Sequence, residues 1–163
     1  MNGALGRGLG RTLEWILISL MVGLTTLVVV AVIFRKSGAS LSFYDEVASV
    51  LLAWITYYGS ALAALRRKHI GFDAVLLSIP MPARMWFVAF GEVLVIAFFV
   101  LMAWAGLRVL DVLEGESLVS LTWVPVQLTQ SVIPIGAMLF IAAELLSLPA
   151  YWRQIATGQS SDH

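Results

Sequence analysis

The sequence predicts an all-α integral membrane protein with four transmembrane helices. Of the 163 residues, 60% are hydrophobic and 12% are charged, and the mean hydropathy is +0.92. Soluble domains carry about 25% charged residues, so this chain has too few charges to cover a water-exposed surface. Four mostly apolar runs of about 20 residues, the length that a membrane-spanning helix needs, also follow one another along the chain.

The four spans are expected to form one membrane domain over residues 1–163. They cover about residues 15–34, 47–65, 85–107 and 124–148. The first two contain no charged residue, and the short links predict that neighbouring helices run antiparallel. The first run is longer than the 7–15-residue core of a signal peptide, so we interpret it as a retained span.

Lysine and arginine in the short loops predict the orientation, because they favour the cytoplasmic side. One side would carry Arg7, Arg11, Arg66, Arg67, Lys68, Arg84 and Arg153. The other side would carry only Arg35, Lys36 and Arg108. Both termini are therefore expected to face the cytoplasm.

The link after the second span starts with three cations and a histidine, "RRKH". We interpret Arg66, Arg67 and Lys68 as the cytoplasmic end of the span, reaching to lipid headgroups; a dedicated lipid or substrate site is the alternative. Beyond His69, apolar residues recur at i, i+3, i+4 and i+7 from Phe72 to Ile79. This spacing predicts a short amphipathic helix over residues 71–79 that lies in the membrane interface.

Two carboxyl groups interrupt the apolar spans. Glu92 lies in the third expected span and Glu144 near the end of the fourth, both towards the cytoplasmic side. Intramembrane charge is costly and often functional, which makes a proton or ion relay one interpretation. We favour structural carboxyl groups that bind a neighbouring helix, because no helix interruptions occur in matched positions of two halves.

Several residues are typical of helix–helix contacts in membranes. A polar stripe follows one side of the fourth expected span, and a small-xxx-small pair lies in the second. These residues are Gln127, Gln130, Ser131 and Pro134 in the stripe, and Gly59 and Ala63 in the pair. Contact with another membrane protein and packing within the chain itself are both open interpretations.

Composition excludes several function classes. The chain has no cysteine, which removes disulfides and thiolate metal sites, and its net charge of zero does not favour nucleic acid. His69 and the terminal His163 are the only histidines, so a haem or catalytic histidine inside a span is excluded. Most of the six tryptophans lie near span ends and are interpreted as interface anchors, with Trp54 the deepest.

The order of motifs resembles the small membrane subunit, DctQ type, of tripartite ATP-independent periplasmic (TRAP) transporters. The matching elements are Arg35 after the first span, Tyr44-Asp45-Glu46 before the second, residues 59–63, His69-Ile70 with Asp73, and Pro134-Ile135-Gly136. The departures are Phe43-Tyr44 where tryptophan is usual, Ser60 in the alanine-rich stretch, and Phe72 where valine is common. The similarity covers about residues 12–152.

The resemblance implies a non-catalytic scaffold without cofactors, in the bacterial cytoplasmic membrane. Its implied partners are a large membrane subunit, which would hold the sodium and substrate sites, and a periplasmic solute-binding protein, besides membrane lipids. The complex would act as a symporter, for example in organic acid uptake. The alternative is a self-sufficient homo-oligomeric transporter or channel that uses Glu92 or Glu144.

Residue roles follow from this resemblance as hypotheses. Arg35 and Lys36 would pair across the first periplasmic turn with Asp45 and Glu46, or this turn would contact the periplasmic protein. The acidic link with Asp111, Glu114 and Glu116 is a second candidate docking surface. The polar stripe and the small-xxx-small pair would contact the large subunit. His69 and Asp73 would organise the turn into the interfacial helix.

Overall fold

The computed structural model describes residues 4–39, 41–66 and 80–157, and within these ranges every regular element is a helix. The helices are α1 (Ala4–Lys36), α2 (Tyr44–Leu65), α4 (Met81–Val112), α5 (Val126–Gln130) and α6 (Val132–Thr157). Four segments are long and apolar enough to cross a membrane, with α5 and the first part of α6 counting as one. The prediction of an all-helical, four-span chain is confirmed. The interfacial helix expected over residues 71–79 lies outside the described residues, together with Arg67, Lys68, His69 and Asp73.

Three helices extend well beyond the apolar runs that predicted them. α1 begins at Ala4 instead of near residue 15. α4 continues to Val112 instead of ending near residue 107, and α6 continues to Thr157 instead of ending near residue 148. The apolar run reports the thickness of the hydrocarbon core, whereas a helix ends only where its hydrogen bonding stops. At the end of α1, Gly38 has a φ of +86° and the Ala39 N–H donates to the carbonyl of Phe34 at 3.1 Å. This is a Schellman turn, which needs glycine at the left-handed position.

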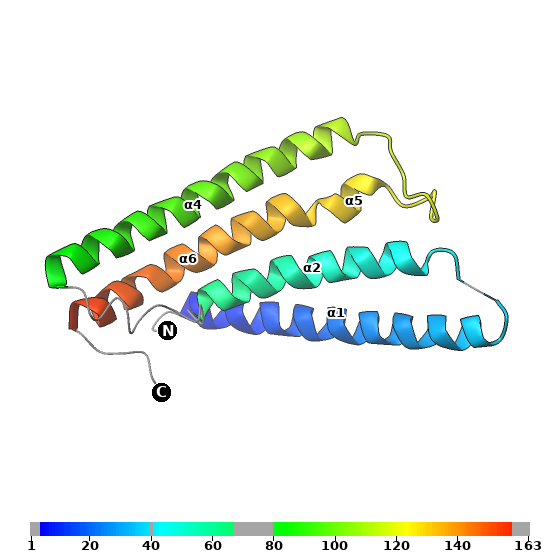
Figure 1. Ribbon diagram of the computed structural model, residues 1–163, viewed down its shortest axis with the longest axis horizontal. Helices are drawn as coiled ribbons and strands as arrows, with labels where there is room; N and C mark the ends of the chain where they lie inside the picture. The colour runs from blue at the N-terminus through cyan, green and yellow to red at the C-terminus, as the bar shows by residue number, and fades with distance from the viewer. Residues whose placement is uncertain (1–3, 40, 67–79, 158–163) are drawn as a thin grey trace.

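The helices lie side by side in the order α1, α2, α6, α4, and we call this arrangement the open row (Figure 1). The extensive contacts join α1 to α2, α2 to α6 and α6 to α4. α2 and α6 are therefore the inner helices, while α1 and α4 lie at the two ends of the row. The start of α1 and the end of α6 lie at the same end of the molecule (Figure 1), as four antiparallel crossings require. Which membrane side this end faces stays a prediction.

Small residues let the inner helices approach closely. Ala61, Ala64 and Ala143 are fully buried where α2 meets α6, and Leu13 of α1 packs against the same cluster. Such contacts matter in lipid because helix association there depends on van der Waals packing, since lipid tails are as apolar as leucine. α4 joins the row through Phe99, whose ring stacks on Phe140 of α6 with the centroids 3.7 Å apart.

The fourth span is interrupted, which the apolar run did not predict. α5 ends at Gln130 and α6 begins at Val132, with Ser131 between them. Pro134, the third residue of α6, has no N–H to donate to the preceding turn, so regular helical bonding cannot continue through this point. The interruption lies alongside the middle of α2 (Figure 1).

Candidate functional site

A polar region with many hydrogen bonds lies at one end of the row, where the connection between α1 and α2 meets the connection between α4 and α5. We call it the loop end: residues 37–46 between α1 and α2, without the undescribed residue 40, and residues 111–125 at the end of α4 and before α5. The longer connection folds back on itself. Leu118 N–H donates to the carbonyl of Val124 and Val126 N–H donates to that of Glu116, both at 3.0 Å. Leu118, within this connection, is buried.

Glu46 in the first turn of α2 ties the two connections together. Its Oε1 accepts a hydrogen bond from the Val119 N–H at 3.0 Å, and its Oε2 accepts one from the Ser120 N–H at 2.8 Å. The Ser120 hydroxyl adds a longer bond to the carbonyl of Ser42 at 3.3 Å. Hydrogen bonds from N–H groups to an ionised acceptor are stronger than neutral ones, so one carboxylate fixes the position of the whole loop.

Among the described residues the structure shows no ion pair between Arg35 and Glu46, and the pairing of Arg35 and Lys36 with Asp45 and Glu46 stays a prediction. Both carboxylate oxygens of Glu46 are used by backbone N–H groups instead. Arg35 and Lys36 are exposed in the last turn of α1, where a cation interacts favourably with the helix dipole. Asp45 is exposed beside Glu46. Sequence reasoning missed this arrangement because backbone N–H groups leave no trace in the pattern of charges.

The outer surface of the loop end is both acidic and apolar. Asp111, Glu114 and Glu116 are exposed, as the sequence predicted for this link. Beside them in the chain, Val119 is 91% exposed and Trp123 is 80% exposed. A folded loop that exposes both carboxylates and an aromatic side chain can contact another protein, because aromatic residues are enriched in interfaces.

Several residues predicted to contact another subunit are in contact within the chain. Gln127 Nε2 donates to the carbonyl of Leu110 at the end of α4, at a distance of 3.0 Å. Pro134 is buried next to Gly106 of α4. Gly59 faces Leu17 of α1. Packing within the chain, one of the two interpretations left open by the sequence, therefore accounts for these three residues.

The remaining members of that set are less engaged with other helices. The Ser131 hydroxyl donates to the carbonyl of Leu128 in the preceding turn, at 2.7 Å. Gln130 and Ala63 are half-buried. Contact of any of these residues with a second subunit stays a prediction.

Trp54 has a role inside the row that its interpretation as an interface anchor missed. Its indole N–H donates to the carbonyl of Thr129 at 3.0 Å, which joins α2 to the α5–α6 interruption. Thr129 is buried. A broken helix leaves carbonyls that need a donor, and lipid supplies none. Pro134 in the fourth span together with a tryptophan deep in the second is the sequence signal that points to this bond.

The opposite end of the row contains the cations and carboxyl groups near the end of α2 and the start of α4. Arg66, predicted to mark the end of the second span, forms an ion pair with Glu14 of α1. Glu144 is buried, with 4% of its surface exposed, and Arg84 and Ser147 are buried too. Glu92 is half-buried. Among the described residues, no group of three or more histidine, aspartate or glutamate side chains could hold a metal ion.

Four potential membrane-crossing segments in an open row, with an ordered loop end, define a multi-pass membrane protein. Its family follows from the sequence: residues 10–154 match the family described as tripartite ATP-independent periplasmic transporters, DctQ component. This match covers nearly the whole chain, so the protein belongs to the DctQ family, the small component of these transporters. A comparison with curated proteins finds no match.

Proposed function

We propose that this chain is the non-catalytic scaffold subunit of a sodium-coupled, binding-protein-dependent transporter in the bacterial cytoplasmic membrane. The open row is the observation on which the proposal rests. A closed bundle hides the inner sides of all its helices, but here α1 and α4 keep most of their large apolar side chains exposed. A broad, rigid apolar layer suits a subunit that binds alongside a larger membrane protein and enlarges it.

The partner in this proposal is the large membrane subunit, which would hold the sodium ions and the substrate. Membrane subunits associate through close packing and through interhelical hydrogen bonds, and the exposed sides of the row offer the packing surface. Within this chain the polar groups with visible partners, such as Gln127 and Trp54, are used to hold its own helices together. That use is expected of a static scaffold.

The loop end is the proposed docking surface for the periplasmic solute-binding protein. The Glu46 hydrogen bonds hold this loop in one shape, which lowers the entropy lost when a partner binds. Trp123 supplies an apolar contact, and the exposed acids of the same connection favour a partner surface that carries lysine or arginine.

Reconstitution tests the scaffold role. The chain is purified with and without a large subunit, and sodium-driven solute uptake is measured in proteoliposomes with the periplasmic protein added. We expect a stable complex of the two membrane subunits, and uptake only when all three proteins are present. Uptake by this chain alone would contradict the proposal and would favour the self-sufficient transporter, with Glu92 and Glu144 as the residues to replace next.

Docking has a separate test. Replacing Asp111, Glu114 and Glu116 together by alanine should weaken binding of the periplasmic protein, mainly by slowing association, because charges at the rim of an interface act on the encounter rate. The association rate is measured against reconstituted complex at low and moderate salt. The matched control replaces Arg7 and Arg11, at the opposite end of the row, by glutamine and should leave this rate unchanged. An unchanged association rate in the triple variant would remove this loop from the docking surface.

A further inference from the structure

We propose that the first turns of α1 form a binding site for the headgroup of an anionic phospholipid. A hollow of about 460 Å³ lies against this part of the helix and is lined by Arg7, Gly8, Arg11, Thr12 and Trp15. All five residues belong to α1, so the hollow lies on the surface of a single helix. The proposal does not depend on the scaffold role, and it concerns the end of the row opposite to the loop end.

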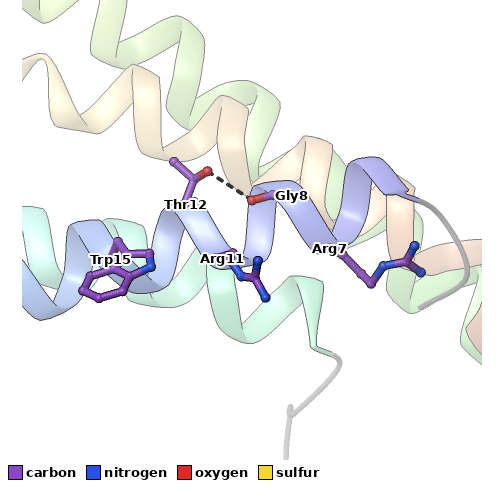
Figure 2. A pocket seen from close by; sticks show the side chains of 5 residues that line it. All are labelled: Arg7, Gly8, Arg11, Thr12 and Trp15. Carbon is purple, nitrogen blue, oxygen red and sulfur yellow. Dashed lines mark hydrogen bonds between the residues drawn. The ribbon is translucent and has the colours of Figure 1, made fainter.

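The two guanidinium groups are placed to bind one anion together. Arg7 and Arg11 are four residues apart, so their side chains start about 5–6 Å from each other on one side of the helix. Figure 2 shows both side chains along the same side of α1 as Trp15. Guanidinium groups match the oxygens of a phosphate in pairs, which is why arginine is common in phosphate recognition.

No competing acid neutralises this pair among the described residues. Glu14 is the one carboxylate in α1, and it forms an ion pair with Arg66 of α2. The hydroxyl of Thr12 donates to the carbonyl of Gly8 at 3.1 Å, so it too has a partner within the helix (Figure 2). The positive charge of the two arginines is therefore left for a ligand from outside the chain.

The length of α1 indicates where the hollow lies relative to the hydrocarbon core of the membrane. Its 33 residues span about 50 Å at 1.5 Å per residue, whereas the hydrocarbon core is about 30 Å thick. If the core begins near Trp15, Arg11 lies about 6 Å outside it and Arg7 about 12 Å outside it, within reach of the headgroups. Trp15 is exposed at the boundary, where tryptophan rings prefer to lie. At this depth the two guanidinium groups can reach the phosphates of lipid headgroups.

Gly8 lines the hollow beside the two arginines and leaves that part of it open. A Cβ atom added there would meet nothing within 4 Å, and the backbone is helical, so a larger residue fits without strain. A headgroup can approach the helix at this point because no side chain covers it. The same feature allows a variant that fills the hollow without changing any charge.

The test measures binding of phosphatidylglycerol and phosphatidylcholine to the purified full-length chain in neutral detergent, by native mass spectrometry. We expect tighter binding of phosphatidylglycerol. Replacing both arginines (R7Q/R11Q) should weaken it by about tenfold or more, because each cation near an anionic lipid surface adds to the attraction. The matched control, R35Q/K36Q, removes two exposed cations from the other end of α1 and should leave the affinity unchanged. Circular dichroism checks that every variant keeps its helix content.

A steric pair of variants separates the hollow from general charge. G8L should reduce phosphatidylglycerol binding, whereas G23L, at an equally open position in the middle of α1, should not. Equal losses in both charge variants, or an unchanged affinity in R7Q/R11Q or G8L, would overturn the proposal. Displacement of the lipid by an equal concentration of inorganic phosphate would also overturn it, because the site would then bind free phosphate instead of a headgroup.

Discussion

Glu46 shows how one residue can determine the shape of a connection that lies more than seventy positions further along the chain. Its carboxylate accepts both loop hydrogen bonds at once, from Val119 and Ser120. The two donors are backbone groups of consecutive residues, so almost any side chains at these two positions would keep the bonds. Formation of these two bonds therefore depends on the carboxylate of Glu46 and on the path of the loop backbone, and not on the side chains of Val119 and Ser120.

Replacing Glu46 by glutamine should loosen this loop. A glutamine side chain has one acceptor oxygen, and its amino group cannot accept the second N–H, so one of the two bonds is lost. Hydrogen exchange at the amides of Val119 and Ser120 should become faster, while exchange in the middle of α2 should not change. Asp45→Asn is the matched control, since it removes the neighbouring exposed charge. Unchanged exchange at both loop amides would show that the loop holds its shape without Glu46.

Trp54 acts at the same scale inside the row. Trp54→Phe keeps an aromatic ring but removes the N–H that reaches the Thr129 carbonyl. We expect a loss of about 1 kcal/mol in the free energy of unfolding, the usual size of an interhelical hydrogen bond in a membrane. Unfolding in detergent measures this loss. Trp86→Phe, at a position that is 79% exposed, is the control and should have little effect; an equal loss in both variants would contradict the role of the bond.

At the scale of elements, the distance between α2 and α6 depends on a glycine. A Cβ atom placed on Gly136 of α6 would lie 2.7 Å from the Cβ of Tyr57 in α2, which is closer than two carbon atoms can pack. Tyr57 cannot move its own Cβ without shifting the helix backbone. The contact between the two inner helices therefore requires glycine at this position.

Gly136→Ala should destabilise the protein by about 1–3 kcal/mol, the usual cost of overpacking a well-packed core. Gly91→Ala is a matched control on α4, because a Cβ atom there would meet nothing within 4 Å. That variant should be neutral or stabilising by up to about 1 kcal/mol, since alanine favours a helix more than glycine does. Unfolding of both variants in the same detergent gives the comparison. Equal stability of the two would show that α2 and α6 can separate without loss.

At the scale of the whole molecule, the open row determines how much surface is left for partners. A helix at the end of a row packs mainly against one neighbour, so α1 and α4 each leave a wide apolar side uncovered. In a membrane this side is covered either by lipid or by a second protein. The proposed scaffold role requires that the large subunit covers part of it.

Nitroxide labels can distinguish lipid from protein on these surfaces. The chain has no cysteine, so single cysteines can be introduced without removing any. Suitable positions are the exposed Met21 and Val22 on α1 and Val93 and Leu94 on α4, since adjacent residues sample different sides of a helix. When the large subunit binds, the rate at which the labels collide with dissolved oxygen should fall at the pair of positions on one helix. The pair on the other helix then serves as the control. Unchanged values at all four positions would contradict binding through the end helices.

The sequence alone determined the class of the protein. Four apolar runs predict four spans because lipid accepts only backbone that satisfies its own hydrogen bonds, and an uninterrupted apolar helix is the simplest way to do so. The order of Arg35, Asp45-Glu46 and Pro134-Ile135-Gly136 indicated the family that the match over residues 10–154 confirms. Both signals are local in the chain, which is why they can be read without a structure.

Only the tertiary structure decided which helices are neighbours and what the polar residues bind. Composition does not distinguish an open row from a closed bundle, because α1 and α4 would be apolar in either arrangement. The partners of Glu46 and Trp54 are backbone groups in distant segments, and a backbone N–H or carbonyl is present at almost every position of the chain. A charge pattern therefore suggested an ion pair with Arg35, and only the path of the chain shows that the carboxylate binds the loop.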